Sequence, residues 1–364
     1  MKCVTFMVKT FEGGGAQRVI QTLTRYFVSQ DIEVQIVTLF WAKSYDLSES
    51  VRVWNIDADR SDLSVEHNSL QIQKTSEFLK AHETDFVIIC STSAPLYRYA
   101  LELQKENPFK IIAAMTNAPE FSPRTLQGRQ ERDLIFEQLC QNNSGFIFQT
   151  PHERDYFHPD IRRESVIIDN PITQEISAPY CGPRTKEIVS AGRYDEQKNF
   201  ELLIRAFGLL HKTYPDYTLK IYGRGHMEQE YIRLIKELEL EEFVLLKPFT
   251  LNIHEEIKKS AMFVQSSDYE GVSNILLECI VLGLPVISTD CPAYGAREFI
   301  TDGFNGLLVE PNNDRQLCDA MIKVIQTPEF VENAQSISSS VKERLDIECV
   351  GKAYVAYMNR LGDK

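Results

Sequence analysis

Short apolar runs and longer segments with helical periodicity alternate along the chain. The runs at 3–8, 85–90 and 262–265 have the length and composition of strands that are buried on both faces of a sheet. The segment that follows Ala16 instead repeats its apolar residues every three or four positions, which is typical of an amphipathic helix. Strands that alternate with helices in this way predict a doubly wound α/β protein built on parallel sheets.

The alternation begins twice, which predicts two domains. One series opens with the strand at 3–8 and the other with the strand at 187–192. Between them, residues 174–186 contain two prolines and a glycine, and such a composition is typical of a linker. A final helical stripe covers about 347–359. The length of 364 residues is sufficient for two domains of ordinary size.

The composition argues against several classes of function. The formal net charge of −13 makes duplex nucleic acid an unsuitable partner. No stretch approaches the roughly 18 consecutive apolar residues of a membrane span. The eight cysteines form no CxxC pair, and several lie within apolar runs, so we expect reduced thiols of a cytosolic protein.

Two glycine-rich turns lack the fingerprint of a dinucleotide-binding domain. The turn at 13–15 would need glycine or alanine at position 18, where the chain has Arg18. The turn at 223–225 has Glu228 at the position of the third glycine. A dinucleotide-dependent oxidoreductase is therefore disfavoured.

The stretch 265–278 concentrates candidate chemistry. It follows a buried strand and leads into a helix that is expected to begin near Ser273, whose hydroxyl would serve as the N-cap. Such a helix directs its free N–H groups and positive dipole end at the carboxyl edge of the sheet, where anions bind. We expect Glu270 in the loop before the helix, with Asn274 and Glu278 on one helix face. Carboxylates accept hydrogen bonds from hydroxyls, so these two glutamates could bind a sugar. The alternative is that Glu270 is an ordinary turn residue and Glu278 lies on a solvated helix face.

A pair of cations follows the first strand of the second series. Arg193 and Lys198 lie five residues apart around a strand-to-helix turn, so both side chains can converge on one anion. Arginine offers a bidentate fork and lysine a compact charge, which suits a diphosphate. The alternative is an exposed pair of turn residues.

These motifs together resemble the retaining glycosyltransferases of family 4, the group 1 type. The resemblance rests on Gly192-Arg193 with Lys198, on Glu270-Gly271 with Glu278, and on the later motifs Gly283-Leu-Pro285 and Asp302-Gly303-Phe-Asn305-Gly306. It implies the GT-B fold, with two Rossmann-like doubly wound domains facing each other across a cleft and a C-terminal helix that crosses back to the first domain. The implied domains are an acceptor-binding domain at 1–173, a linker at 174–186, a nucleotide-sugar-binding domain at 187–343 and a helix at 344–364.

The resemblance also implies an activity. A hexose or N-acetylhexosamine would pass from a UDP-sugar to a glycan or polyprenyl-diphosphate-linked acceptor in cell-surface polysaccharide or glycoconjugate synthesis. The configuration of the transferred sugar would be retained, and no cofactor or metal ion would be required. A non-catalytic GT-B partner subunit of another transferase and a UDP-sugar epimerase stay open as alternatives. The implied location is the cytoplasm. Contact with the inner face of the plasma membrane through the basic segment 122–139 is a further option, and an ordinary solvated helix is its alternative.

The family pattern assigns a role to individual positions of this chain. Arg193, Lys198 and Glu270 would be catalytic, with the two cations on the diphosphate and the carboxylate on the donor sugar. The residues implied to bind the donor are Gly14, Gly15, Asn117, Gly192, Gly223, Pro248, Phe249, Gly271, Val272, Ser273, Asn274 and Glu278. Two positions depart from the pattern, because Thr116-Asn117 replaces a usual histidine and Pro248 replaces a usual glycine.

Overall fold

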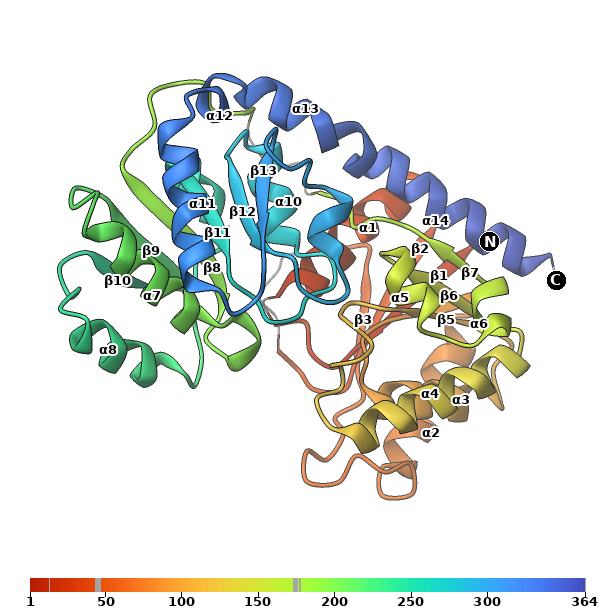
Figure 1. Ribbon diagram of the computed structural model, residues 1–364. Helices are drawn as coiled ribbons and strands as arrows, with labels where there is room; N and C mark the ends of the chain where they lie inside the picture. The colour runs from red at the N-terminus through yellow and green to blue at the C-terminus, as the bar shows by residue number, and fades with distance from the viewer. Residues whose placement is uncertain (13, 43–46, 173–175, 177, 364) are drawn as a thin grey trace. The chain divides into compact units, whose positions relative to one another are not determined.

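The chain forms two compact units in a computed structural model that describes residues 1–12, 14–42, 47–172, 176 and 178–363 (Figure 1). Unit 1 comprises Met1–Gln174 and Leu345–Lys364, and unit 2 comprises Glu175–Arg344. Each unit contains a parallel sheet with helices packed on it. The doubly wound α/β class predicted from the alternating pattern is therefore confirmed.

Unit 1 is organised around a seven-stranded sheet of order β3-β2-β1-β4-β5-β6-β7, in which all paired neighbours in the described part of the chain are parallel. Its elements are β1 (Cys3–Val8), α1 (Gly15–Ser29), β2 (Glu33–Thr38), β3 (Arg52–Asn55), α2 (Ser69–Ala81), β4 (Phe86–Cys90), α3 (Ala94–Gln104), β5 (Lys110–Ala114), α4 (Leu126–Gln141), β6 (Gly145–Phe148), α5 (Pro151–Asp155), α6 (Pro159–Arg163), β7 (Ser165–Ile167) and α14 (Ile347–Gly362).

Alternate residues of β1, an interior strand of the sheet, contribute to the two cores of unit 1. Every residue of β1 is buried. Phe6 joins a core with residues of α1 and α14 on one face of the sheet, whereas Met7 joins a core with residues of α2, α3 and α4 on the other. Burial on both faces explains why this strand reads as a continuous apolar run rather than an alternating one.

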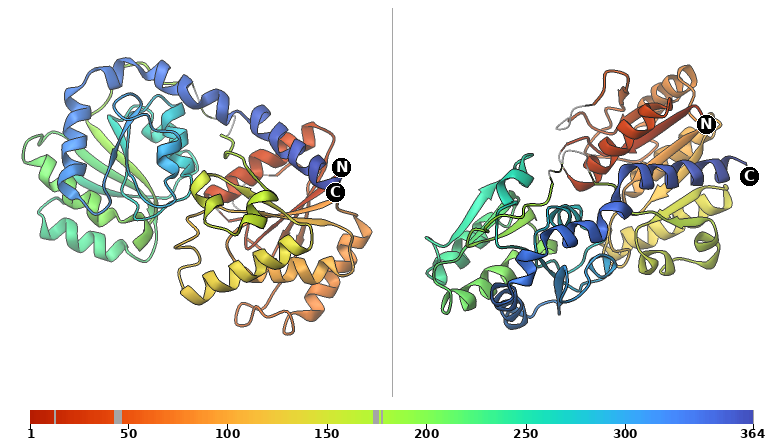
Figure 2. Two further views of the ribbon diagram at one scale, coloured as in Figure 1. Left: turned by 45° about the vertical axis from the view of Figure 1, so that its right-hand side comes forward. Right: turned by 90° about the horizontal axis from the view of Figure 1, so that it is seen from above.

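The last helix of the chain belongs to unit 1, where α14 packs beside α1 (Figure 2). Its Tyr357 hydroxyl accepts a hydrogen bond from the Phe146 N–H at 2.7 Å and donates to the Glu164 carbonyl. Burial raises the pKa of Tyr357 to about 12. Gly351 allows a close approach to α1, since a Cβ there would lie 2.3 Å from atoms of the Tyr26 ring.

Replacing Gly351 with leucine is expected to destabilise the protein by about 1–3 kcal/mol, because overpacking forces the helices apart. Urea or thermal unfolding would measure the loss. Gly362→Ala on the same helix is the matched control, since a Cβ there meets the Phe86 ring at an ordinary 3.7 Å. Equal stability of the Gly351→Leu variant and the control would contradict the packing of α14 against α1.

A capping box begins α5, with Thr150 at the N-cap position and Pro151 at the first helical position. The Thr150 hydroxyl accepts from the Glu153 N–H at 3.0 Å, and the Glu153 carboxylate accepts from the Gln149 N–H at 2.8 Å. The Glu153 side chain is fully buried, and this burial raises its pKa to about 8.

This raised pKa predicts that the stability of the fold depends on pH. Between the ordinary pKa of 4.5 and about 8, the folded carboxyl keeps a proton that the unfolded chain has released, so stability falls as pH rises through this window. Glu153→Gln keeps the capping geometry without a charge. Its melting temperature relative to wild type should rise on going from pH 5 to pH 8, by an amount equivalent to roughly a few kcal/mol. The exposed Glu137→Gln variant is the control, and a parallel response of wild type and Glu153→Gln would contradict the assignment.

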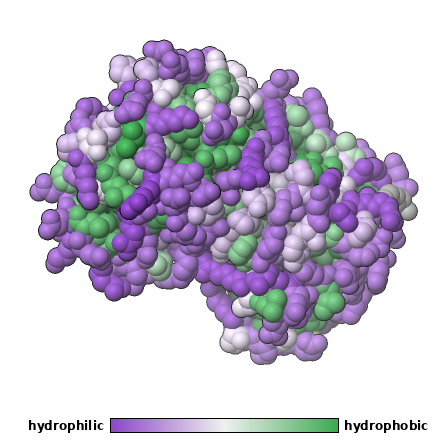
Figure 3. Space-filling view, in the orientation of Figure 1, coloured by the Kyte–Doolittle hydropathy of each residue, from purple (hydrophilic) through white to green (hydrophobic). Residues whose placement is uncertain are grey.

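The basic segment 122–139 is less available to an anionic surface than its sequence suggests. Arg132 is fully buried; its guanidinium donates to the Pro119 carbonyl at 2.8 Å and pairs with Asp133 at 2.6 Å. This cation anchors the preceding loop and does not contribute to a basic outer face. Leu126 and Leu134 are exposed on α4. Figure 3 shows a mostly hydrophilic visible face with scattered hydrophobic residues. Across the described residues, no helix combines the length and apolar character needed to span a bilayer.

Unit 2 repeats the architecture with a six-stranded parallel sheet of order β10-β9-β8-β11-β12-β13 in the described part of the chain. Its elements are β8 (Glu187–Arg193), the 3-10 helix η1 (Glu196–Lys198), α7 (Phe200–His211), β9 (Thr218–Arg224), α8 (Glu228–Glu237), β10 (Val244–Pro248), α9 (Ile253–Ile257), β11 (Met262–Gln265), α10 (Asn274–Val281), β12 (Val286–Thr289), η2 (Gly295–Glu298), β13 (Gly306–Val309), α11 (Asp314–Gln326), α12 (Glu329–Glu332) and α13 (Ala334–Leu345). Apolar residues of its strands form a core with α7, α8 and α11.

Candidate active site

The order of strands in unit 2 places the candidate residues at a switch point. β8 and β11 are neighbours in the sheet, yet the chain leaves β8 toward β9 on one side and β11 toward β12 on the other. Ligands of open parallel sheets bind beyond the carboxyl ends of two such strands. Arg193 ends β8 and Gln265 ends β11, so the predicted cation motif and glutamate loop meet at this edge.

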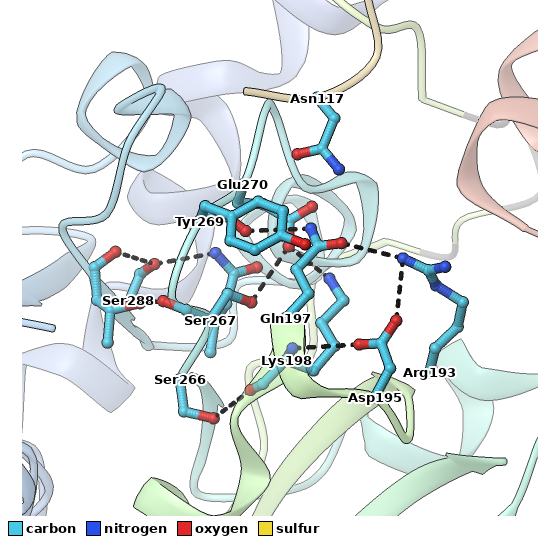
Figure 4. A network of polar contacts seen from close by, with 12 residues as sticks. Asn117, Arg193, Asp195, Gln197, Lys198, Ser266, Ser267, Tyr269, Glu270 and Ser288 are labelled. Atoms are coloured by element: carbon cyan, nitrogen blue, oxygen red, sulfur yellow. Dashed lines mark hydrogen bonds and ion pairs between the residues drawn. The ribbon is translucent and has the colours of Figure 1, made fainter. Parts of the chain in front are cut away.

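Lys198 and Glu270 form an ion pair at the centre of this edge (Figure 4). The Lys198 Nζ lies 2.5 Å from the Glu270 Oε2, and each side chain is only 14% exposed. The Ser267 hydroxyl donates to the same oxygen at 3.1 Å. Two of the predicted catalytic residues, 72 positions apart in the sequence, are thus brought into direct contact.

Glycines at the ends of β8 and β9 make room for this arrangement. A Cβ on Gly192 would lie 3.1 Å from Cδ and Cε of Lys198, whose stem passes over the end of the strand. A Cβ on Gly223 would lie 1.9 Å from the Gly192 carbonyl oxygen. Position 223 therefore requires glycine for packing, whatever ligand it contacts, and a side chain at position 192 would have to displace the stem of Lys198.

Arg193 comes from the same turn as Lys198 but has different partners. Its Nη2 donates to the Gln197 Oε1 at 3.0 Å and lies 3.2 Å from the Asp195 Oδ2, and its side chain is 68% exposed. Asp195 also accepts from the backbone N–H of Lys198 at 3.3 Å. The two cations flank one turn, with Lys198 buried against Glu270 and Arg193 reaching solvent.

Gln197 connects the cation turn to the loop after β11, a role that sequence reasoning missed. The Gln197 side chain is buried, with 3% of the residue exposed, and its Nε2 donates to the Tyr269 carbonyl at 3.0 Å. The backbone carbonyl of Gln197 accepts from the Asp268 N–H at 2.9 Å. Asn199 adds a third link, since its Nδ2 donates to the Asp268 Oδ1 at 2.6 Å. Burial raises the pKa of the Asp268 carboxyl. The only available signal was the position of Gln197 and Asn199 on either side of Lys198.

The Glu270 loop is held from its other side by the segment after β12. The Glu270 N–H donates to the Pro292 carbonyl at 2.7 Å, and the Ala293 N–H donates to the Glu270 carbonyl at 3.1 Å. A Cβ on Gly295 would lie 2.0 Å from the Gly271 carbonyl oxygen, so these segments are in close contact. Backbone hydrogen bonds thus fix the position from which the Glu270 side chain extends.

The helix predicted after this loop is α10, and it begins at Asn274 directly after Gly271, Val272 and Ser273. Glu270 lies in the loop and Glu278 on the helix, as predicted. Ser273 occupies the N-cap position, but its hydroxyl makes no capping hydrogen bond. The prediction of a side-chain cap was therefore wrong, because the Ser273 hydroxyl does not engage the N–H groups of the first turn.

Glu278 is almost fully buried and has a partner that the sequence analysis missed. The Glu278 Oε2 lies 2.8 Å from the His254 Nε2, and the two side chains are 5% and 12% exposed respectively. His254 belongs to α9, twenty-four residues earlier in the chain. A lone histidine among acidic residues gave no signal of this contact in the sequence.

The remaining predicted donor-binding residues lie at the ends of other elements. Pro248 ends β10, and the exposed Phe249 ring lies 5.6 Å from the Arg224 guanidinium. In unit 1, Gly15 begins α1 with Gly14 at its N-cap position, and the Asn117 Oδ1 accepts from the next N–H at 2.8 Å. Gly13 of the same turn lies outside the described residues.

A metal ion often accompanies a bound diphosphate, and carboxylate oxygens are its usual protein ligands. Within the part of the chain that the structure describes, no three or more His, Cys, Asp or Glu side chains are grouped so that they could hold a metal ion.

Comparison with known proteins finds a family model that matches part of the chain. Residues 181–343 match the family Glycosyl transferases group 1. An uncharacterized glycosyltransferase of Haemophilus influenzae is 24% identical over 96% of this chain and 97% of its own length. The N-acetylgalactosamine-N,N'-diacetylbacillosaminyl-diphospho-undecaprenol 4-alpha-N-acetylgalactosaminyltransferase of Campylobacter jejuni is 41% identical over 143 residues, which are 39% of this chain and 38% of that protein.

The likeness of fold extends over both units. The crystal structure of a TarM mutant of S. aureus, in complex with fondaparinux, alpha-GlcNAc-glycerol and UDP, matches with a TM-score of 0.81 and 14% identity, covering 99% of this chain and 100% of that one. The chain therefore has the GT-B fold predicted from its motifs, and its residues 181–343 match the group 1 glycosyl transferases.

Proposed function

We propose that this protein is a retaining glycosyltransferase that moves a hexose or N-acetylhexosamine from a UDP-sugar to a glycan or lipid-linked glycan acceptor. The observation that carries the proposal is the Lys198–Glu270 pair at the switch point between β8 and β11, beside the start of α10. UDP in the related TarM complex and the diphospho-undecaprenol substrate in the Campylobacter relative's name support the classes of donor and acceptor.

The charges of the site suit the leaving group. When the bond between the sugar and the diphosphate breaks, negative charge grows on the phosphate oxygens and the sugar becomes oxocarbenium-like. Lys198 and Arg193 would stabilise that charge from the side of β8. The backbone N–H groups of Gly271, Val272 and Ser273 would face the same phosphates at the positive end of α10.

Carboxylates would hold the two sugars of the donor. Glu270, fixed by its loop, would accept hydrogen bonds from hydroxyls of the transferred sugar, while Glu278 would accept from the ribose. Main-chain atoms at Pro248 and Phe249 would contact the base. Gly14, Gly15 and Asn117 of unit 1 would complete the donor and acceptor contacts. The new bond forms from the acceptor oxygen to the sugar carbon on the face of the leaving group, and the departing phosphate takes the acceptor's proton.

A donor screen tests this function. The purified protein would be incubated with UDP-glucose, UDP-galactose and their N-acetylamino forms, with and without EDTA, and released UDP and sugar would be followed by NMR. Slow UDP release that survives EDTA, and is faster with polyprenyl-diphosphate-linked glycans, is expected. Interconversion of sugars without UDP release would indicate an epimerase instead. No turnover and no thermal stabilisation by any donor would contradict the proposal.

A further inference from the structure

His254 makes the contact to the candidate site that the donor-binding scheme leaves unexplained. Its Nε2 lies 2.8 Å from the Glu278 Oε2, and both side chains are withdrawn from solvent. In the proposed scheme Glu278 is ionised and only accepts hydrogen bonds, which requires the His254 Nε2 to carry the hydrogen and donate it. The orientation of one carboxylate oxygen is therefore set by a ring from a different helix.

The position of the His254 ring is determined by its own helix. Ile253 and Ile257, four residues apart on α9, are 6% and 0% exposed and anchor that helix in the core. The chain enters α9 through a turn in which the Asn252 N–H donates to the Thr250 hydroxyl at 3.1 Å. The backbone of His254 is thus held in place, and its ring is only 12% exposed beside Glu278.

A long flexible carboxylate gains selectivity only when its orientation is restricted. Recognition of a hydroxyl discriminates strongly against an analogue that lacks it, because the buried acceptor is then left without a donor. This discrimination requires an acceptor that cannot turn away to another partner. The donor from His254 supplies that restriction at an almost fully buried site.

We propose that His254 is the positioning residue that holds Glu278 against the ribose hydroxyls, and that the His254–Glu278 pair makes the protein select ribonucleoside over deoxyribonucleoside diphosphates. This inference rests on the proposed function, since it takes the ribose of a UDP-sugar as the partner of Glu278. His254 does not itself contact the nucleotide in this scheme; it acts through Glu278.

Calorimetry with UDP and 2′-deoxy-UDP tests the proposal through the ratio of the two dissociation constants. Wild type should prefer UDP by about tenfold or more, the value of a hydrogen bond to a buried charged group. His254→Ala, Glu278→Ala and the double variant should each bring the ratio close to one, with no further loss in the double variant. His254→Gln, which keeps an N–H donor, should retain part of the preference and serves as the measurement if the alanine variant does not fold.

His226→Ala is the matched control, because His226 and Glu196 form an equally short pair of 2.8 Å on the surface of the same unit, where both side chains are about 60% exposed. This variant should keep the wild-type ratio. A wild-type ratio in both His254 variants would overturn the proposal and leave His254 with a structural role only. Equal affinities of the wild type for UDP and 2′-deoxy-UDP would also overturn the proposal. A wild type that binds neither nucleotide would instead count against the proposed function itself.

Discussion

Replacing Lys198 with alanine is expected to lower kcat for sugar transfer by about a hundredfold or more, as for other groups that stabilise charge in the transition state. The Lys198 ammonium is almost buried and paired with Glu270, so water could not easily replace it in its proposed role on the diphosphate. Initial-rate measurements over a range of donor concentrations would give kcat and KM separately. A rate within a factor of about three of wild type would remove Lys198 from the catalytic scheme.

Loss of stability must be separated from loss of catalysis in this variant. Removing one partner of a buried ion pair leaves an uncompensated charge and costs about 3–5 kcal/mol. The double variant Lys198→Ala/Glu270→Gln removes that charge and should recover melting temperature without recovering kcat. Lys236→Ala, an exposed change on α8, is the control for the loss of one positive charge and should behave as wild type.

Arg193→Ala is expected to lower kcat by a similar factor, about a hundredfold, with almost no change in melting temperature. The reason for the difference is exposure, because the Arg193 side chain is 68% exposed, whereas that of Lys198 is 14% exposed. Arg193→Lys should recover only part of the rate, since a lysine cannot offer the bidentate fork. Thermal unfolding and steady-state kinetics on the same preparations would test both statements.

The control for Arg193 is Arg233→Ala, at an exposed arginine of α8 whose side chain is 73% exposed and paired with Glu230. Wild-type kinetics are expected for it. If Arg193→Ala were equally active, the turn after β8 would bind the diphosphate through Lys198 and backbone groups alone. Gln197→Ala offers an independent check, because loss of the Gln197 Oε1 should release Arg193 and lower the rate less than Arg193→Ala does.

The fold was predictable because burial and chain order leave few alternatives. Strands such as β1 and β11 are buried on both faces, so they appear in the sequence as uninterrupted apolar runs. In helices such as α1 the apolar residues repeat at the helical period, and Val19, Leu23 and Phe27 of that pattern are all buried. A parallel sheet then requires right-handed crossovers, and the doubly wound arrangement follows.

The site was predictable only in part, because its contacts join residues distant in sequence. The loop position of Glu270 and the helical position of Glu278 followed from local pattern. The grouping of Lys198 and Glu270 in one site followed from a family resemblance, but their direct ion pair was not predicted. The bridge through Gln197 and the pair of His254 with Glu278 were not predicted either, because each depends on how separate segments pack. The burial of Arg132 could not be predicted for the same reason, because the packing of neighbouring segments covers a charged residue that the sequence pattern would place in solvent.

The central claim is that the turn after β8 and the start of α10 bind one diphosphate, and calorimetry with UDP and with uridine tests it most directly. Wild type should bind UDP at least about a hundredfold more tightly than uridine, because the two phosphates meet fixed positive charge. Lys198→Ala and Arg193→Ala should each lose most of that difference while keeping the affinity for uridine. Wild-type affinity for UDP in both variants would contradict the claim.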